Sequence, residues 1–519
     1  MKYISTRGQI EPIDFQDAVL TGLADDGGLI IPQSIPDVSA SLDKWRKLSY
    51  VDLAYEVLRL FISDIPQADL KDLLKRTYTT QAFVSEIAPT VAVGPMFILE
   101  LWHGPTLAFK DHALQLLGNL FEYILARRGG QLNVLGATSG DTGSAAIYGV
   151  RGRKGIHIFM MHPNGRVSPI QERQMTTVLD ANVHNIAVDG SFDDCQSIMK
   201  QLAGDLDFKR KYSLGAVNSV NWARVLAQIV YYFHTVFDVQ ARTGAKAVRV
   251  AVPTGNFGDV LAGWYARQMG LPISKLILAT NQNDILSVFF NTGLYRRGQA
   301  VQTFSPSMDI QVASNFERYL YYRLGRDAAA LRKMMSDFSR TGQLQVPLTA
   351  GQTVDAVFTA GSASEPEVLA TIKKYYEQYD YLLDPHTAVG VTVADRLRGE
   401  PDASARVPLT SRDAQASGAL ECGGPDAALA PLSGSSDAGR SSRVPGKSGV
   451  DAAALQNDPI VCLATAHPAK FAAAIVKATG KDLAHHPSLD ALAALPTRCQ
   501  VLPNDKTAVR QFISSTLGY

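Results

Sequence analysis

The sequence of 519 residues has little net charge and few cysteines. Its 50 Lys and Arg residues almost balance its 49 Asp and Glu residues, so the formal net charge is +1. A nearly neutral chain gives no electrostatic basis for binding nucleic acid or an anionic membrane. The cysteines lie far apart without the spacing of zinc ligands, at Cys195, Cys422, Cys462 and Cys499. They are typical of a reduced intracellular protein, and no metal site is predicted.

Long apolar runs and targeting signals are also missing. The longest apolar run, Val225 to Phe237, is interrupted by Gln228 and His234, so no membrane span is expected. The first eight residues lack the apolar core of a secretory signal and the Arg/Ser-rich pattern of a transit peptide. We therefore expect a soluble, globular, cytoplasmic protein whose length allows two or three domains.

One segment lacks the residues that build a core. From Gly399 to Val450 the chain is rich in Ala, Ser, Gly, Pro and Asp and has no aromatic residue, isoleucine or methionine. Such a segment buries too little apolar surface to offset its ordering entropy, which predicts a disordered insertion over residues 399–450. A tolerated surface loop is the simpler interpretation of this insertion, and a regulatory role is the alternative.

The rest of the chain alternates between apolar runs and helical patterns. Residues 1–95 are expected to be mostly helical, with helices near 15–23 and 51–61. Beyond this region the apolar runs predict strands at 133–137, 156–161, 248–252, 276–279 and 460–464. Helical patterns follow at 113–126, 144–149, 260–269 and 470–478. This alternation is typical of an α/β fold with an open, mainly parallel sheet, which binds ligands at the carboxyl ends of its strands.

The stretch from His103 to His112 places Lys110 between a Gly-Pro segment and the start of a predicted helix. The positive end of a helix dipole disfavours a second positive charge at that position. A lysine that is also partly desolvated there binds its proton less tightly, as a Schiff-base lysine must. For a lone lysine, however, a solvated side chain beside a helix cap is the commoner situation.

Glycine-rich turns follow three of the predicted strands. None of them matches the P-loop pattern or the dinucleotide fingerprint GxGxxG with its acidic partner. The turn from Gly255 to Asp259 has the pattern of a nest of backbone N–H groups for one phosphate, although tight turns need glycine for conformational reasons alone. A reactive lysine, a phosphate nest and a hydroxyl at a strand end, Thr465, are together what an enzyme dependent on pyridoxal phosphate (PLP) requires.

The chain resembles the threonine synthases, which are PLP enzymes of fold type II. The matching stretches follow in order along the chain: residues 3–7, 25–29, 103–111, 137–143, 218–224, 253–259, 305–309, 384–386 and 465–470. The resemblance implies two α/β domains with open, mainly parallel sheets, formed by residues 96–398 and 451–519, and an added N-terminal region. It also implies PLP as cofactor, a monomer, and conversion of O-phospho-L-homoserine and water to L-threonine and phosphate.

The resemblance also implies roles for individual residues. Lys110 matches the lysine that binds the cofactor covalently and acts as the base. The residues that match the cofactor site are Asp141, Gly255, Asn256, Phe257, Gly258, Asp259 and Thr465, of which residues 255–258 bind the phosphate and Thr465 faces the pyridine nitrogen. The residues that match the substrate site are Ser139, Thr142, Asn218, Ser219, Asn221 and Arg224. In this set, the guanidinium of Arg224 would bind a phosphate through a pair of charge-assisted hydrogen bonds.

Simpler interpretations stay open for several of these residues. Asn218 and Asn221 have the pattern of turn and cap residues before a helix, and a lone arginine such as Arg224 is more often solvated. The histidines near the matching stretches, His103, His112, His386 and His467, are expected to be structural, with a proton-transfer role for His103 or His112 as the alternative. Ser307 and Asp309 are expected to shape a wall of the pocket.

Two other functions fit the same motifs. One is a PLP-dependent lyase that acts on the same substrate and releases phosphate, ammonia and 2-oxobutyrate. The other is a non-catalytic metabolite-binding protein that keeps the fold, which Lys110 argues against.

Overall fold

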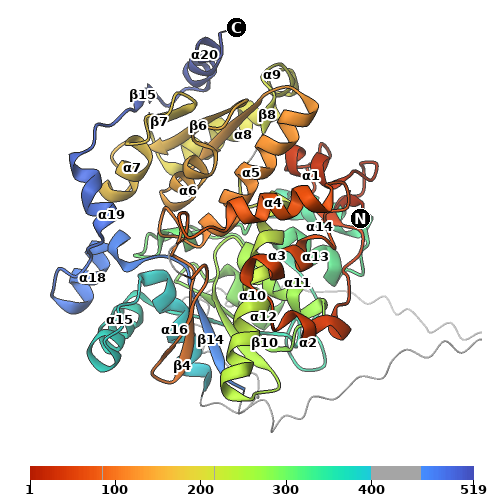
Figure 1. Ribbon diagram of the computed structural model, residues 1–519, viewed down its shortest axis with the longest axis vertical. Coiled ribbons are helices and arrows are strands. Elements are labelled where there is room, and N and C mark those ends of the chain that lie inside the picture. Colours follow the sequence, from red (N-terminus) through yellow and green to blue (C-terminus); the bar gives the residue numbers. More distant parts are fainter. Residues whose placement is uncertain (84–85, 216, 399–457, 519) are drawn as a thin grey trace, which may run out of the picture.

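Two mainly parallel sheets and the helices around them form the body of the protein (Figure 1). The computed structural model describes residues 1–83, 86–215, 217–398 and 458–518. The larger sheet has the strand order β13 (Phe358–Ser362), β10 (Ile273–Thr280), β9 (Val248–Pro253), β14 (Ile460–Ala464), β4 (Met96–Glu100) and β3 (Thr90–Val93). Neighbouring strands are parallel except for β3, which pairs antiparallel with β4.

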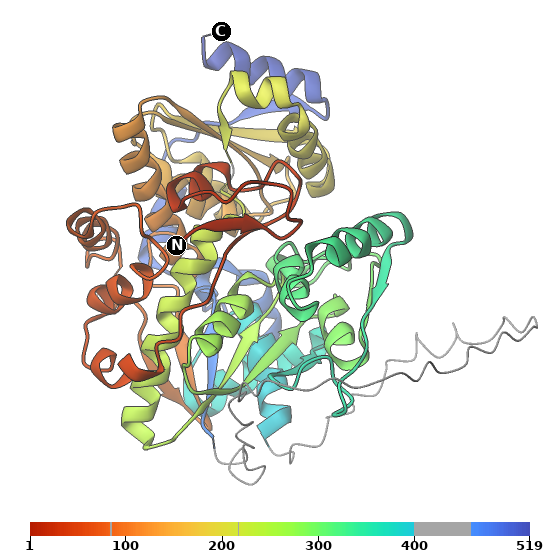
Figure 2. The same ribbon diagram turned by 90° about the vertical axis from the view of Figure 1, so that its right-hand side faces the viewer.

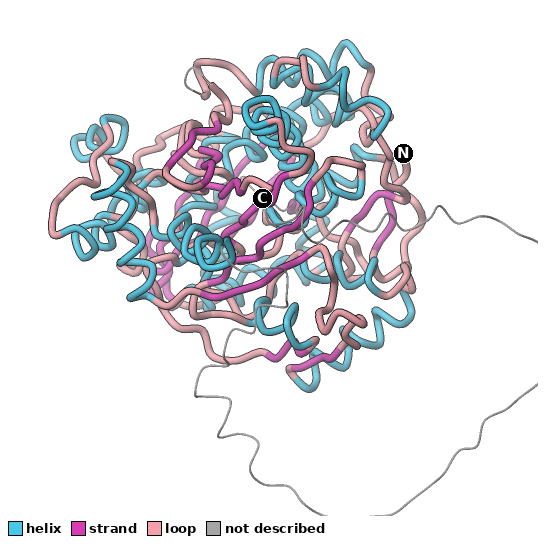
Figure 3. The backbone as a smooth tube through the Cα atoms, turned by 90° about the horizontal axis from the view of Figure 1, so that it is seen from below, coloured by secondary structure: helices cyan, strands magenta, loops and turns pink. Residues whose placement is uncertain are grey.

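The smaller sheet is entirely parallel. Its strand order is β15 (Gln500–Pro503), β7 (Val183–Asp189), β6 (Ile156–Pro163), β5 (Leu132–Ala137) and β8 (Leu214–Gly215). The last part of the chain enters both sheets, because β14 lies inside the larger one and β15 forms an edge of the smaller one. Figure 3 shows the strands in the middle of the molecule with the helices around them.

Apolar side chains on both faces of the strands explain why the larger sheet is buried between helices. In β9, Val250 belongs to one hydrophobic cluster and the next residue, Ala251, to another. In β10, Leu276 and Ile277 are divided in the same way. Successive strand residues point to opposite faces, so a continuous apolar run packs against helices on both sides.

Helices cover both faces of each sheet (Figure 2). One face of the larger sheet packs against α10 (Trp222–Thr243), α11 (Gly258–Gln268) and α12 (Ile285–Thr292), and the other against α16 (Pro385–Arg398), with α15 (Glu365–Tyr379) and α18 (Ala472–Thr479) outside it. The smaller sheet lies between α5 (Lys110–Arg128), α6 (Asp141–Val150) and α7 (Pro169–Thr176) on one side and α8 (Phe192–Gly204), α9 (Leu206–Lys211) and α20 (Lys506–Thr516) on the other.

The N-terminal region wraps around one side of this body. It contains the antiparallel pair β1 (Tyr3–Ser5) and β2 (Ile30–Pro32), and the helices α1 (Phe15–Thr21), α2 (Leu42–Trp45), α3 (Tyr50–Leu58) and α4 (Gln67–Thr77), with the 3-10 helix η1 (Ser39–Ser41). The buried Tyr3 hydroxyl donates to the carbonyl of Phe61 at 2.8 Å. Arg7 forms a two-pronged ion pair with Glu317, at 3.1 and 3.0 Å, in the first turn of α13 (Phe316–Arg323). The first contact holds the region together, and the ion pair with Glu317 fastens it to the rest of the chain.

Short elements complete the described chain. They are β11 (Leu294–Arg296) paired with β12 (Gln343–Gln345), α14 (Ala328–Thr341), α19 (Pro487–Asp490), and the 3-10 helices η2 (Pro306–Met308), η3 (Pro468–Lys470) and η4 (Ala491–Ala494). Among the helices that the structure describes, none has both the length and the apolar character needed to cross a bilayer.

The α/β fold with mainly parallel sheets is confirmed, and each of the five predicted strands is present within three residues of its expected ends. One prediction is wrong in detail. The helix expected over residues 470–478 is divided at Phe471, because Pro468 at the first position starts the short helix η3 and α18 begins only at Ala472. The predicted insertion, 399–450, lies outside the described residues.

Helices α5 and α6 approach each other closely, and two glycines permit this. A Cβ atom at Gly118 would lie 1.8 Å from the carbonyl oxygen of Gly149, and one at Gly149 would lie 2.5 Å from the carbonyl oxygen of Leu114. Both distances are far below van der Waals contact, so only glycine fits at either position. The same two helices begin at Lys110 and Asp141, and their packing therefore sets how far apart these residues lie.

We predict that Gly118→Ala destabilises the protein by about 1–3 kcal/mol, because the added methyl group forces α5 away from α6. Scanning calorimetry of the full chain measures this as a lower unfolding midpoint. The matched control is Gly204→Ala at the end of α8, where a Cβ atom meets nothing within 4 Å. An equal loss of stability in both variants would contradict the prediction.

Candidate active site

Lys110 is the first residue of α5, and its side chain is buried with 7% of its surface exposed. The preceding loop is fixed to the strand that ends at Ala464, because the Phe109 amide donates to the Thr465 carbonyl at 2.9 Å. Lys110 Nζ lies 3.4 Å from Asp141 Oδ2 and 4.7 Å from the centre of the Phe109 ring. The predicted position at a loop-to-helix junction is confirmed, and the solvated alternative is wrong for this lysine.

Several groups act on the pKa of Lys110. Burial lowers it, and the nearby cations Lys470 and Arg224 act in the same direction, whereas Asp141 raises it. Desolvation outweighs the carboxylate, so the pKa of this amine lies below its ordinary value. A lysine in this state has more of the neutral amine at neutral pH, which is the form that attacks a carbonyl or accepts a proton.

Asp141 begins α6 directly after the turn that follows β5. Its carboxylate accepts a hydrogen bond from Gln171 Nε2 at 2.7 Å and one from Ser307 Oγ at 3.1 Å. It also forms an ion pair of 2.6 Å with the buried Lys470. Burial raises the pKa of Asp141, but the ammonium groups of Lys470 and Lys110 outweigh this and hold the pKa well below its usual range. The carboxylate is therefore ionised.

The turn before Asp141 carries Ser139 and Thr142, which are both partly buried. Thr138 shapes this turn, because its hydroxyl accepts hydrogen bonds from the amides of Gly140 at 3.0 Å and Gly143 at 2.9 Å. Ser139 and Thr142 therefore flank Asp141 at the N-terminus of α6, where the helix dipole favours a negatively charged ligand.

The second glycine-rich turn, Gly255 to Gly258, follows β9 and leads into α11. A Cβ atom at Gly255 would lie 2.6 Å from the carbonyl oxygen of Ser307, so the turn packs backbone to backbone against η2. Phe257 has φ of 62°, a left-handed conformation that a bulky residue rarely adopts. Its ring is locked among Phe290, Phe316 and other aromatic side chains. Backbone strain held by tight packing is typical of a binding turn.

Asp259 lies in the first turn of α11 and is buried. Its Oδ1 accepts hydrogen bonds from the hydroxyls of Tyr231 at 2.6 Å and Tyr232 at 2.9 Å. No described residue gives its Oδ2 a hydrogen bond, although that atom is buried. Burial raises the pKa of Asp259 to about 6, despite the lowering effect of the two tyrosines. A buried oxygen of this kind can accept a hydrogen bond from a water molecule or from a ligand.

Asn315, which no sequence motif singled out, hydrogen-bonds to both Asn256 and Ser219. Its backbone amide donates to the Asn256 carbonyl at 3.0 Å, and its side-chain Nδ2 donates to the Ser219 carbonyl at 3.1 Å. Ser219 Oγ also lies 2.7 Å from Ser314 Oγ. The segment 218–224 therefore lies directly beside the 255–258 turn, as two neighbouring binding segments should.

The asparagines of the 218–224 segment have protein partners. Asn221 caps α10, because its Oδ1 accepts from the Ala223 amide at 3.1 Å, and its Nδ2 donates to the Val19 carbonyl at 2.9 Å. These contacts favour the capping role over contact with a ligand. Asn218 is partly buried, and its Nδ2 makes a weak contact of 3.6 Å with the sulfur of Met199.

Arg224 differs from both asparagines. It is buried with 4% of its surface exposed, and one terminal nitrogen donates to the Val217 carbonyl at 3.1 Å. Within the described chain its Nε has no hydrogen-bond partner and its guanidinium has no carboxylate in ion-pair range. Burial lowers its pKa to about 10, so the group remains charged. A buried cation without a counter-ion is a site prepared for an anion.

Thr465 follows the last residue of β14 and is buried. Its amide donates to Thr387 Oγ1 at 3.3 Å, and the Thr387 hydroxyl in turn donates to Asp384. His386 Nε2 accepts a hydrogen bond from the Ser307 amide at 3.3 Å, so its Nδ1 carries the hydrogen that is donated to Asp384 at 2.9 Å. Residues 384–386 therefore hold η2, which contains Ser307, in place.

The other three histidines make structural contacts. His112 Nε2 donates to the Ile87 carbonyl at 2.9 Å, and burial lowers its pKa to about 4. His103 lies 2.8 Å from Glu100. His467 caps η3, and burial lowers its pKa to about 4. These contacts agree with the expected structural roles. Asp309, expected to shape the pocket wall, binds Thr303, Asn281 and Asn283 through its carboxylate.

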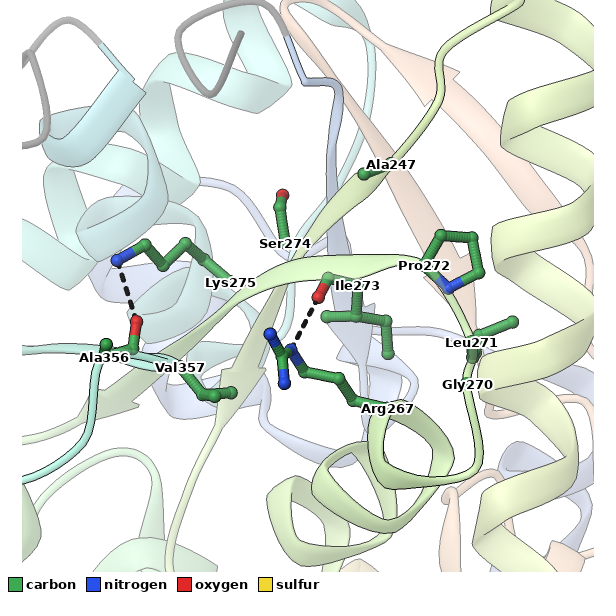
Figure 4. Close-up of a pocket in the computed structure, with 10 residues that line it drawn as sticks. All are labelled: Ala247, Arg267, Gly270, Leu271, Pro272, Ile273, Ser274, Lys275, Ala356 and Val357. Atoms are coloured by element: carbon green, nitrogen blue, oxygen red, sulfur yellow. Dashed lines mark hydrogen bonds between the residues drawn. The ribbon is translucent and has the colours of Figure 1, made fainter. Parts of the chain in front are cut away.

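A separate pocket of 510 Å³ lies at the amino ends of β9 and β10, on the edge of the sheet opposite these residues (Figure 4). Its polar groups do not converge. Lys275 Nζ donates to the Ala356 carbonyl and Arg267 Nε to the Ile273 carbonyl, both at 2.9 Å, and the Ser274 side chain points elsewhere. The chemistry is therefore assigned to the carboxyl ends of the strands.

Family comparisons agree with this geometry. Family models match in order along the chain: "Threonine synthase N terminus" at residues 2–78, "Pyridoxal-phosphate dependent enzyme" at 84–361 and "Threonine synthase, C-terminal" at 448–513. The threonine synthase of Methylobacillus glycogenes is 42% identical over 99% of both chains. That of Schizosaccharomyces pombe is 48% identical over 75% of this chain and 82% of its own.

Solved structures show the same relationship. The PLP-bound threonine synthase from Brucella melitensis is 39% identical and superposes with a TM-score of 0.84 over 100% of both chains. The yeast threonine synthase is 40% identical, with a TM-score of 0.82 over 99% of this chain and 98% of its own. The chain therefore belongs to the threonine synthase family of pyridoxal-phosphate-dependent enzymes.

Proposed function

We propose that this protein uses PLP to convert O-phospho-L-homoserine and water to L-threonine and phosphate. Family membership supports the reaction class. The single structural observation that carries the proposal is the arrangement of Arg224, which is buried without a counter-ion beside a second anion-binding turn. A cofactor phosphate and a substrate phosphate need two separate sites, and the 255–258 turn and Arg224 supply them.

The residues present fit PLP. The turn at Gly255 approaches the η2 backbone too closely for any side chain, which leaves its amides as the groups that face a ligand. Asp259, in the first turn of α11, follows this turn directly, and its buried Oδ2 can accept a hydrogen bond. Lys110 would hold the cofactor covalently, residues 255–258 its phosphate, and Thr465 its pyridine nitrogen, with Asp141 and Asp259 beside them. When bound, PLP supplies an electron sink that allows a proton to leave the carbon next to the substrate amine.

The side chains around the substrate then have separate tasks. The neutral Lys110 amine accepts the Cα proton and then one Cβ proton, which allows the γ-phosphate to leave with the electrons of the bond from Cγ to oxygen. A proton is then delivered to Cγ, which becomes the methyl group of threonine, water adds its hydroxyl at Cβ, and a proton returns to Cα. Asp141 fixes the position of this amine through the contact at 3.4 Å. Arg224 binds the γ-phosphate and stabilises its charge as the bond from Cγ to oxygen breaks. Ser139 and Thr142 hold the α-carboxylate at the N-terminus of α6.

We extend the proposal to the organisation of the chain. Residues 96–398 and 451–519 would form the catalytic core and residues 1–95 an N-terminal region that supports it. A monomeric state is what the resemblance to the threonine synthases implies. A cytoplasmic location follows from the widely spaced cysteines and from a substrate of central amino-acid metabolism.

The deciding experiment incubates the purified protein with PLP and O-phospho-L-homoserine and measures threonine, phosphate and 2-oxobutyrate together. We expect threonine and phosphate in equal amounts. Phosphate with 2-oxobutyrate and ammonia instead would identify a lyase that acts on the same substrate. No turnover and no visible cofactor absorbance would identify a non-catalytic binding protein.

Lys110→Ala should abolish threonine formation, because it removes both the covalent anchor of the cofactor and the proposed base. The visible absorbance of covalently bound PLP should disappear with it. The matched control is Lys506→Ala, since Lys506 also begins a helix, α20, but is exposed. Threonine formation that survives in Lys110→Ala would contradict the assignment of the base.

Arg224→Gln should lower kcat/KM for O-phospho-L-homoserine about 10- to 100-fold, because a charge-assisted hydrogen bond contributes about 1.5–3 kcal/mol. Arg224→Lys should recover part of this loss, since it keeps the charge without the fork. Arg242→Gln, at the exposed end of the same helix, is the control. Kinetics of Arg224→Gln equal to those of the control would place the substrate phosphate elsewhere.

A further inference from the structure

A second lysine, Lys470, is more deeply buried than Lys110, with 1% of its surface exposed. It ends η3, between β14 of the larger sheet and α18. Its ammonium donates to the Thr106 carbonyl at 2.9 Å and lies 2.6 Å from Asp141 Oδ1. Nothing in the proposed reaction uses this amine directly. A fully buried ammonium group is rarely retained in a protein without a specific partner, and Asp141 is that partner.

The two oxygens of the Asp141 carboxylate are divided between two sets of partners. Oδ1 faces Lys470 at 2.6 Å and Gln171 at 2.7 Å, whereas Oδ2 faces Ser307 at 3.1 Å and Lys110 at 3.4 Å. The contact with Lys470 is thus short and the contact with Lys110 is long. This arrangement holds the carboxylate through Lys470 and leaves Lys110 weakly bound and able to move.

Asp141 without Lys470 would work against the proposed chemistry. A buried carboxylate beside a lysine favours the charged ammonium form, which cannot accept a proton. The same carboxylate would repel an anionic substrate at the N-terminus of α6, between Ser139 and Thr142. A second cation on the other side of Asp141 offsets both effects. It neutralises the charge of the carboxylate, and its positive charge makes protonation of Lys110 less favourable.

We propose that Lys470 is a positioning residue that neutralises and holds the Asp141 carboxylate, so that this carboxylate orients the Lys110 amine without keeping it charged. The inference rests on Lys110 being the reactive amine of the proposed function. Lys470 itself touches neither substrate nor cofactor in this role. It acts on Lys110 through Asp141 and through the repulsion between two buried amines.

Other charged groups face this cluster from the surrounding helices. They are Arg224 from α10, Asp259 from α11, His386 from α16, which faces Asp141, and Asp111 from α5, which faces Lys470. Of these, Arg224 also lowers the pKa of Lys110. A bound substrate phosphate would neutralise Arg224, whereas Lys470 is paired inside the protein. The influence of Lys470 therefore persists when substrate is bound.

The test measures the reactivity of the Lys110 amine itself. The full-length protein is freed of PLP and labelled with acetic anhydride between pH 6 and 11, and mass spectrometry follows the peptide that contains Lys110. In Lys470→Met we expect the labelling midpoint to move up by about one unit, which corresponds to a roughly tenfold smaller fraction of neutral amine at a fixed lower pH. The acid limb of the pH profile of kcat in the PLP-loaded enzyme should move in the same direction.

Comparison of four variants with the unchanged protein separates this role from a purely structural one. Asp141→Asn should lower the labelling midpoint of Lys110, and the double variant Lys470→Met with Asp141→Asn should fall between the two single variants. Lys477→Met, an exposed lysine of α18, is the control and should not move it. Circular dichroism and the unfolding midpoint show which variants are folded.

Each outcome decides the inference. An unchanged midpoint in folded Lys470→Met would overturn it. If Lys470→Met alone does not fold, the comparison passes to Asp141→Asn with and without Lys470, where repulsion between the amines predicts a higher midpoint without Lys470. Equal midpoints there would also overturn it. Labelling reports the amine whether or not the protein makes threonine, so failure of this inference and failure of the proposed function are distinguishable.

Discussion

The contact between a buried lysine and a buried carboxylate is the interaction on which the rest of the structure depends. Lys110 and Asp141 are the first residues of α5 and α6, which pack against the smaller sheet. These helices approach so closely that only glycine fits at Gly118 and Gly149. A helix N-terminus stabilises the Asp141 carboxylate and destabilises the Lys110 ammonium. The two helix N-termini therefore favour an ionised Asp141 and a neutral Lys110, even without a ligand.

Two more buried cations, Arg224 and Lys470, lie close to this pair. Arg224 is buried without a carboxylate partner among the described residues, and Lys470 shares Asp141 with Lys110. Burying uncompensated charge is unfavourable, so the fold must supply stability elsewhere, in the two-sided packing of its sheets. An anionic ligand group beside Arg224 would supply the counter-ion that the described residues do not.

Local pattern singled out Lys110 and the 255–258 turn as candidates at strand ends and helix starts, and the resemblance to a family added Asp141. Lys110, Asp141 and the 255–258 turn stand where an apolar run meets glycine and a helical pattern, and the α/β fold follows from the same alternation. Contacts made by tertiary packing could not be predicted in the same way. Ser307 reaches Asp141 from 166 residues away, and Lys470 reaches the Thr106 carbonyl from 364. Both residues lie in stretches that match the family, but no local periodicity indicates which side chains they contact.

The path of the last part of the chain explains why these distant partners matter. The segment inserts β14 between β9 and β4 of the larger sheet, delivers Lys470 to Asp141, and then adds β15 to the edge of the smaller sheet. Its backbone also bonds the Lys110 loop, through the Phe109 amide and the Thr465 carbonyl. The lysine is thus desolvated by residues that lie far from it in the sequence. Reactivity is therefore a property of the completed fold, and an incompletely folded chain carries an ordinary, protonated lysine.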